Sequence, residues 1–176
     1  ENTLLFLSNI SKIKVKIEIG AKQLTNQIIR VKNKDGNLII RDKDKNRNQE
    51  WLKLDRKTVN DLFVSVAFQL AYDPKKDKKV IKSLKKGNLC IYFPAEKEVS
   101  NLKFHIHAPF AAKVARDSIK SLPENNKLRD DIAELLCDSL DVIKDKGLLD
   151  YNFISSLPIE DDELSDFFEP IREKLI

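Results

Sequence analysis

The fold of this 176-residue chain is decided by the stretch Phe104-His-Ile-His-Ala-Pro-Phe-Ala-Ala-Lys-Val-Ala-Arg-Asp-Ser-Ile119. It begins as a short apolar strand, continues through a link of small apolar residues, and reaches Arg116 and Asp117, where we expect a helix to begin. Leucine and isoleucine then recur at helical spacing from Leu128 to Ile143, which predicts a long amphipathic helix that ends at Gly147. No other segment sets a single arginine in so apolar a surrounding, so Arg116 is the first candidate functional residue.

Upstream of that stretch, short runs typical of strands alternate with turn residues. Residues 3–7 form an apolar run that predicts a buried strand. Residues 12–19 alternate strictly, which predicts a half-buried strand with Ile13, Val15, Ile17 and Ile19 directed inward. Residues 27–32 and 38–41 flank Asp35-Gly36 and predict a hairpin. Further strands are expected at 49–54, 62–71, 88–93 and 103–108.

Together these elements predict an α/β fold of the α+β sandwich type. We expect a mixed, mostly antiparallel sheet with helices packed on one face, followed by a helical C-terminal tail. The tail should hold a short helix or turn within 147–158 and an acidic helix over 161–176. We therefore expect a domain over residues 1–146 and a helical extension over 147–176.

Charge is unevenly distributed along the chain. Residues 1–90 hold 21 Lys and Arg against 10 Asp and Glu, a net +11, and residues 91–176 hold 11 against 18, a net −7, so the whole chain carries +4. The basic run Lys75–Lys86 is the clearest nucleic-acid candidate, but it lacks interleaved aromatic residues for base stacking, which favours a solvated helix or loop edge.

Several other functional classes find little support. The four glycines form no phosphate-binding motif, and no apolar run approaches the length of a membrane span. His105 and His107 share one face of a strand, but zinc needs a third ligand that the neighbouring sequence does not supply, so packing is the favoured role. Cys90 and Cys137 are interpreted as free thiols, which fits a cytoplasmic location. Because the chain lacks methionine and starts at Glu1, we expect it to be part of a longer polypeptide.

A guanidinium fixed at position 116 could approach a phosphate from outside and offset the charge that develops during its transfer. Lys113 lies three positions earlier and is a second cation for the same role. Spacing alone favours the plainer alternative, a structural arginine paired with Asp117 or with a carbonyl.

The order of segments resembles the middle, or transducer, domain of the GHKL ATPases, in the sacsin-like branch related to the large heat-shock chaperone. The segments that carry the resemblance are 4–13, 50–52, 89–96, 104–110 with 114–117, and the helix from Leu128. In the chaperone branch an apolar strand leads into a Ser-Arg-Glu motif, and the corresponding residues here are Ala115, Arg116 and Asp117. Ala115 thus replaces a serine whose hydroxyl could cap a helix.

The resemblance implies that Arg116, with Lys113 as a weaker second, reaches the γ-phosphate of ATP. ATP and Mg²⁺ would be bound by an upstream domain of the same polypeptide and not by this fragment, which should be inactive alone while the parent hydrolyses ATP. It also implies a chaperone-like protein with a protein or nucleic-acid client, no membrane partner, and a parent that is a candidate homodimer. Two alternatives remain open: a nucleic-acid-binding module that uses the basic half, and a structural interaction domain that docks a partner through Glu160–Glu169.

Overall fold

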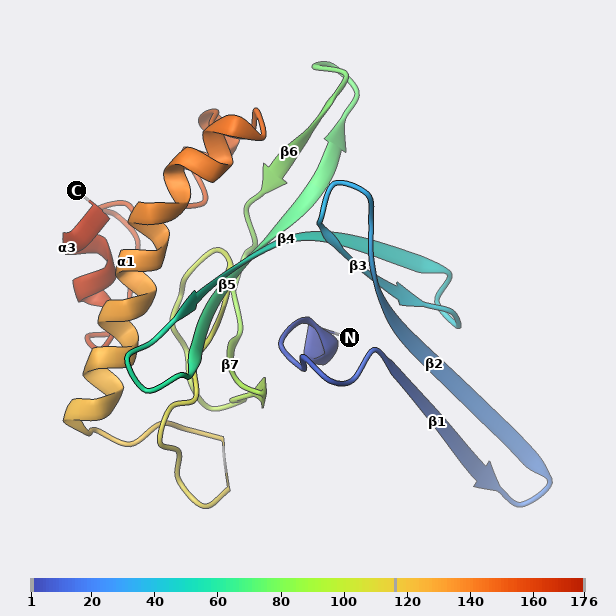
Figure 1. The fold of residues 1–176 in the computed structure, drawn as a ribbon. Coiled ribbons are helices and arrows are strands. Elements are labelled where there is room, and N and C mark those ends of the chain that lie inside the picture. Colours follow the sequence, from blue (N-terminus) through green and yellow to red (C-terminus); the bar gives the residue numbers. More distant parts are fainter. Residues whose placement is uncertain (1, 116, 176) are drawn as a thin grey trace.

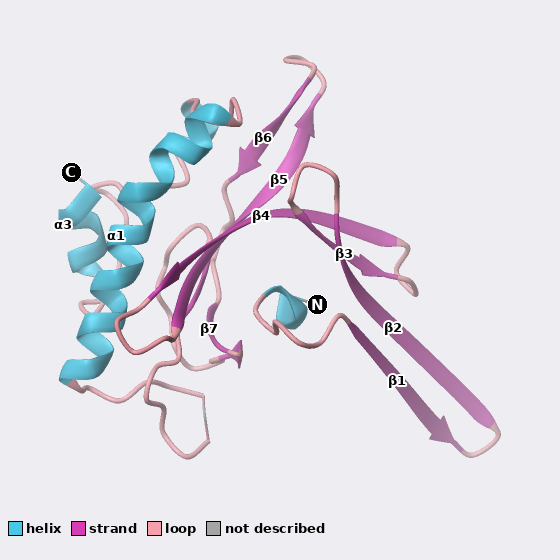
Figure 2. Cartoon of the chain, in the orientation of Figure 1, coloured by secondary structure: helices cyan, strands magenta, loops and turns pink. Residues whose placement is uncertain are grey.

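The computed structural model describes residues 2–115 and 117–175, which form a mixed α/β fold built on one open sheet (Figure 1). Its strands are β1 (Lys12–Ile19), β2 (Lys22–Lys32), β3 (Leu38–Asp42), β4 (Arg47–Lys57), β5 (Phe63–Asp73), β6 (Lys78–Lys82), β7 (Leu89–Ile91), β8 (Phe93–Pro94) and β9 (His105–His107). Its helices are the 3-10 helix η1 (Asn2–Leu5) and the α-helices α1 (Pro123–Asp145), α2 (Tyr151–Ile154) and α3 (Glu169–Leu175). Figure 2 shows α1 and α3 together on one side of the molecule, whereas the short helix at the N-terminus lies among the strands.

The sheet is mostly antiparallel, as the sequence predicts. Its strand order is β1-β2-β3-β4-β5-β9-β7-β8, and β6 pairs with β5 outside that path. Only the β7–β9 pair among the described strands is parallel. The central strand is β5, which pairs with β4, β6 and β9, so the predicted strand over 62–71 is confirmed.

The α-helices pack against one face of the sheet, as predicted. Helix α1 lies across β4 and β5, α3 packs on α1, and α2 contacts β6. Val64, Val66, Phe68 and Leu70 alternate along β5 and enter the core on this face. Leu148, Phe153, Leu164, Phe168 and Ile171 from the C-terminal residues belong to the same hydrophobic cluster. The proposed boundary at residue 146 stays a prediction.

The opposite face of the sheet carries a second, smaller core beneath η1. Leu4, Leu5 and Phe6 are buried there against Trp51. The predicted strand over 3–7 is wrong, because three consecutive apolar side chains enter one core and a strand would direct them to alternate sides. The Arg30 guanidinium holds this turn in place by donating to the backbone carbonyls of Leu4 and Ser8.

Strands β1 and β2 form a long hairpin, which we call the arm, that projects away from the helices (Figure 1). The strand over 12–19 is confirmed, but the predicted burial of its apolar face is wrong. Val15, Ile17 and Ile19 are all exposed, because no described segment covers the arm beyond Ile13 and Ile28, which pack against the smaller core.

Three further predictions need correction. The basic run 75–86 is a turn followed by strand β6. Val80 and Ile81 of this strand are buried, while the lysines around them face outward. The acidic segment 161–168 forms turns, and only Glu169–Leu175 is helical, with Pro170 in the first turn, where its missing N–H costs nothing. No helix begins beside Asp117: the long helix starts at Pro123, because proline suits the first helical turn and keeps the preceding residue extended.

Candidate functional site

The candidate site is built around the loop 111–120, which joins β9 to α1. Ala112 and Ile119 form an isolated antiparallel bridge. The Lys113 N–H donates to the Ser118 carbonyl at 2.9 Å, and the Lys120 N–H donates to the Ala111 carbonyl at 2.9 Å. The loop is therefore closed at its base like a hairpin, with Lys113 and Ala115 on its outward part. Arg116, the residue that sequence analysis ranked first, lies outside the described residues.

The base of this loop is fixed by Asn125, a fully buried residue in the first turn of α1. Its Oδ1 accepts from the Ala111 N–H at 2.8 Å, and its Nδ2 donates to the carbonyls of Ala111 at 3.0 Å and Lys120 at 2.7 Å. A buried amide with three satisfied bonds to loop backbone holds that backbone in one arrangement. Sequence reasoning missed Asn125, because a polar residue at a helix start is usually interpreted as a solvent-facing cap.

Asp117 has a partner within the described structure. Its carboxylate lies 2.5 Å from the Lys97 ammonium, and that hydrogen bond lowers the pKa of Asp117 and raises the pKa of Lys97. Spacing alone suggested Asp117 as a partner for Arg116. The described residues pair this carboxylate with a lysine from the segment after β8, and the suggested pairing with Arg116 lies outside them.

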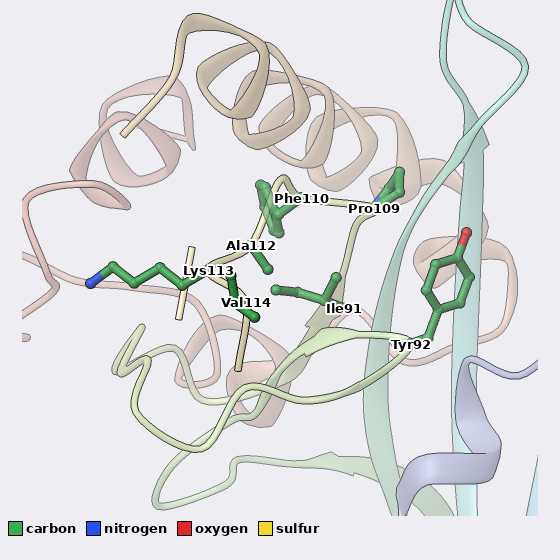
Figure 3. A pocket seen from close by; sticks show the side chains of 7 residues that line it. All are labelled: Ile91, Tyr92, Pro109, Phe110, Ala112, Lys113 and Val114. Carbon is green, nitrogen blue, oxygen red and sulfur yellow. The ribbon is translucent and has the colours of Figure 1, made fainter. Parts of the chain in front are cut away.

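Lys113 lies beside an apolar depression of about 440 Å³. The residues that line it are Ile91, Tyr92, Pro109, Phe110, Ala112, Lys113 and Val114. Figure 3 shows the Lys113 side chain extending away from Ile91 and Tyr92, toward the outside of the loop. The ammonium is exposed and pairs with no carboxylate among residues 2–115 and 117–175, so it can meet an anion brought from outside.

This depression adjoins two others, with which it shares lining residues. It shares Tyr92 with a second depression of about 310 Å³ and Pro109 with a third of about 500 Å³, and the second and third share Leu62. The third lies along the N-terminal part of α1, where burial raises the pKa of Asp131. One end of the molecule, on both sides of the loop, is therefore hollowed.

The second depression contains a polar group that sequence reasoning missed. Lys53 Nζ lies 2.6 Å from Asp55 Oδ1, and the Ser65 hydroxyl donates to the same carboxylate at 2.5 Å. His107 lies opposite Ser65 in the β5–β9 register. The only available signal was that Lys53 and Asp55 share one face of a strand, and nothing in the sequence brings strands β4, β5 and β9 together at that point. Ser65 bonds to Asp55 and not to His107, so these three residues do not form a nucleophilic triad.

The packing role predicted for the two histidines is confirmed. His105 stacks on Trp51 with ring centroids 4.8 Å apart, and its Nδ1 accepts from the Asn88 N–H at 2.7 Å. His107 stacks on Phe6 at 5.2 Å. Burial lowers the pKa of each to about 4, so both rings are neutral at physiological pH. The described residues contain no group of three or more His, Cys, Asp or Glu side chains placed to hold a metal ion.

Several lysines of the basic run are neutralised within the fold. Lys76 and Lys78 each lie 3.4 Å from Asp150, and Lys79 lies 2.7 Å from Glu50. The acidic tail also packs on the body, since Asp162 pairs with Lys103 at 2.7 Å and Phe168 is fully buried.

No helix in the described parts of the chain combines the length and apolar character needed to cross a bilayer. Comparison of the chain with protein-family models, with curated proteins and with solved structures found no match.

Proposed function

We propose that this chain is the middle segment of a larger ATP-dependent, chaperone-like protein of the GHKL class. In this proposal an upstream domain of the same polypeptide holds ATP with Mg²⁺. The loop 111–120 then brings Lys113 and Arg116 to the terminal phosphate and couples hydrolysis to a change in domain arrangement. In this proposal the fragment is inactive alone. The parent is a cytoplasmic, homodimeric ATPase that acts on a protein client.

The observation that carries the proposal is the contrast between the base of the loop and its outward part. Asn125 fixes the base through three hydrogen bonds, whereas the Lys113 ammonium is exposed and pairs with no carboxylate of the described chain. A cation on a fixed loop loses little entropy when it binds a phosphate. It can also stabilise the negative charge that develops during phosphoryl transfer without a rearrangement of the site.

The described residues fit one side of a nucleotide site only. Among the described residues that line the adjacent depression, Lys113 is the one charged residue and the other six are apolar or aromatic. They can exclude water from one side of a bound phosphate, while bound ATP supplies the phosphoryl group and Mg²⁺ supplies charge neutralisation.

The alternative of a nucleic-acid-binding module has weaker support, because Lys76, Lys78 and Lys79 pair with carboxylates of the fold. The alternative of an interaction domain that docks through Glu160–Glu169 also has weaker support, because that segment already packs on the fold. Leu164 and Phe168 belong to the main hydrophobic cluster, and Asp162 pairs with Lys103. The cytoplasmic location is supported by the two free cysteines.

The test is ATP turnover by the intact parent protein that carries Arg116→Ala or Lys113→Ala. We expect Arg116→Ala to lower kcat by about a thousandfold, in the range of other arginines that contact a transferring phosphoryl group. Lys113→Ala should lower it by about tenfold to a hundredfold. ATP affinity, measured separately by equilibrium binding, should change much less than kcat, because the upstream domain holds the nucleotide.

Lys120→Ala is the matched control. Lys120 is an exposed lysine on the returning side of the same loop, and only its backbone takes part in the loop contacts. Its substitution should leave turnover unchanged. Equal turnover in Arg116→Ala, Lys113→Ala and Lys120→Ala proteins would remove this loop from the mechanism.

A further inference from the structure

The outer edge of the arm presents an unpaired strand. Strand β1 ends the sheet order and pairs only with β2 among the described strands. The Arg30 N–H donates to the Ser11 carbonyl at 2.7 Å, which makes these two residues a hydrogen-bonded pair. Hydrogen-bonded and non-hydrogen-bonded pairs alternate along an antiparallel ladder, so Ile13, Val15 and Ile17 bond to β2.

By the same alternation, the backbone N–H and C=O groups of Lys12, Lys14 and Lys16 point away from β2. We call these outward groups the β1 edge. The hairpin turn agrees with this assignment. It has two residues, Gly20 and Ala21, with Gly20 at φ +60°, and such a turn is closed by a hydrogen-bonded pair, here Ile19 and Lys22. The β1 edge is therefore free to accept another extended strand.

The two faces of the arm differ in chemistry. On one face Val15, Ile17 and Ile19 of β1 are 45%, 49% and 65% exposed, and Leu24 of β2 is 59% exposed. This apolar stripe continues outward from Ile13, which packs against the smaller core. On the other face lie Lys12, Lys14 and Lys16, which pair with no carboxylate among the described residues.

The lysines argue against a second copy of this chain as the occupant. Two antiparallel β1 strands centred on Lys14 would align Lys12, Lys14 and Lys16 with the same lysines of the other copy, and like charges directly opposite are destabilising. Glu18 shares this face, so a register that sets Glu18 opposite Lys12 relieves part of the repulsion but still sets Lys14 opposite Lys16. A shift of one residue would place lysines beside isoleucines and bury neither set. Lysine on an edge strand is a common protection against this kind of self-pairing.

We propose that the β1 edge binds an extended protein segment in which apolar and acidic residues alternate. The segment adds a strand beside β1 through backbone hydrogen bonds to Lys12, Lys14 and Lys16. Its Asp or Glu side chains lie on the lysine face, and its apolar side chains extend the stripe formed by Val15 and Ile17. This inference does not depend on nucleotide binding or on the loop 111–120.

The experiment titrates the 176-residue chain against fluorescent peptides of the same eight-residue length as β1, with both ends blocked. The three probes alternate Val-Glu, Val-Gln and Val-Lys, and affinity is measured by anisotropy. We expect the Val-Glu peptide to bind at least about tenfold more tightly than Val-Gln, because it adds three cross-strand charge pairs. Amide hydrogen exchange of Lys12, Lys14 and Lys16 should slow when the Val-Glu peptide is bound.

Two variant sets separate charge from backbone. Reversal of Lys12, Lys14 and Lys16 to Glu should transfer the preference to the Val-Lys peptide, whereas reversal of the exposed Lys75, Lys85 and Lys86 to Glu makes the same change in net charge and should leave it unaltered. Lys14→Pro and Lys14→Gln both remove one charge, but only proline removes the outward N–H. Lys14→Pro should therefore bind the Val-Glu peptide more weakly than Lys14→Gln, although neither disturbs a bond to β2.

Three results would overturn the proposal. The first is equal affinity for the Val-Glu and Val-Gln peptides, and the second is an equal effect of the two triple reversals. The third is a concentration-dependent dimer in sedimentation that Lys14→Pro abolishes, because the edge would then belong to a second copy.

Discussion

Strands β5 and β1 carry similar alternating patterns but have opposite surroundings. In β5, Val64, Val66 and Phe68 enter the large core beneath α1, and Ala67 enters the smaller core on the other face. In β1, the isoleucines and valine share one face just as regularly, but beyond Ile13 that face meets no other segment. Alternation therefore determines which side chains share a face, whereas coverage of that face depends on elements elsewhere in the chain.

We call the sheet from β3 onward, with the helices packed on it, the body. The largest expected effect that separates the body from the arm is a loss of stability of the body in acid. His105 and His107 are buried at 3% and 5% exposure, and burial lowers the pKa of each from 6.5 to about 4. The unfolded chain therefore binds protons that the folded chain does not between these two pH values. The free energy of unfolding should not depend on these two histidines above about pH 7 and should fall between pH 6.5 and 4. Near pH 4, where both rings are protonated in the unfolded chain, the loss should reach about 3 kcal/mol per histidine.

Urea unfolding from pH 7.5 to 4 measures this loss, and His105→Gln with His107→Gln is the comparison. The double variant should start less stable, because the ring stacking is lost, but its stability should decline less steeply between pH 6.5 and 4. A neighbouring pair of charges, Lys53 and Asp55, shifts the pKa of His107 in opposite directions, so burial remains the main cause. Parallel pH profiles for the two proteins would contradict the assigned cause.

The next effect compares a glycine in the body with a glycine at the tip of the arm. A Cβ on Gly87 would lie 1.8 Å from the Phe104 carbonyl oxygen, and this backbone is fixed by the 2.6 Å bond from the Gly87 N–H to the Leu102 carbonyl. We expect Gly87→Ala to cost about 3 kcal/mol or more, because backbone must move inside a packed core. Urea unfolding with far-UV circular dichroism gives the measurement.

Gly20→Ala is the matched substitution in the arm. A Cβ there has no atom within 4 Å, and its only cost is the positive φ of +60°. That conformational penalty is about 1 kcal/mol. An equal cost at both glycines would mean that the Phe104 backbone yields easily, which would weaken the contrast between a packed body and an open arm.

Much of the sheet could be predicted from local pattern alone. The hairpin over 27–41, the central strand at 62–71 and the helix over 128–143 each follow from side-chain period and turn residues within a single segment. The error at 3–7 and the missed strand within 75–86 have a common cause. In both, buried residues such as Leu5 and Ile81 take their conformation from pairing or packing with other segments, which the period of their own segment cannot reveal.

The candidate site was predictable only in part. The apolar stretch before Arg116 marked the loop, and Lys113 was named with it, but the fixing role of Asn125 depends on a helix that turns back over the loop base. The group of Lys53, Asp55 and Ser65 depends on the pairing of β4, β5 and β9. Composition and spacing cannot supply such pairings, because the residues brought together are separated by as many as 54 positions, from Lys53 to His107.

The smallest expected effect tests the arm itself. Ile17→Ala should change the free energy of unfolding by less than about 0.5 kcal/mol, because the side chain is already 49% exposed and leaves no cavity. Ile106→Ala, in the fully buried centre of β9, should cost about 2–5 kcal/mol by the same urea measurement. Both substitutions remove the same atoms, so the difference between them measures coverage and not side-chain chemistry.

If Ile17→Ala costs as much as Ile106→Ala in the isolated chain, the apolar stripe of the arm must be covered in solution, and the β1 edge would not be free for a partner. If the cost at Ile17 is small alone but rises when the Val-Glu peptide is present, the stripe is open and becomes buried on binding, which is the behaviour that the geometry of the arm requires.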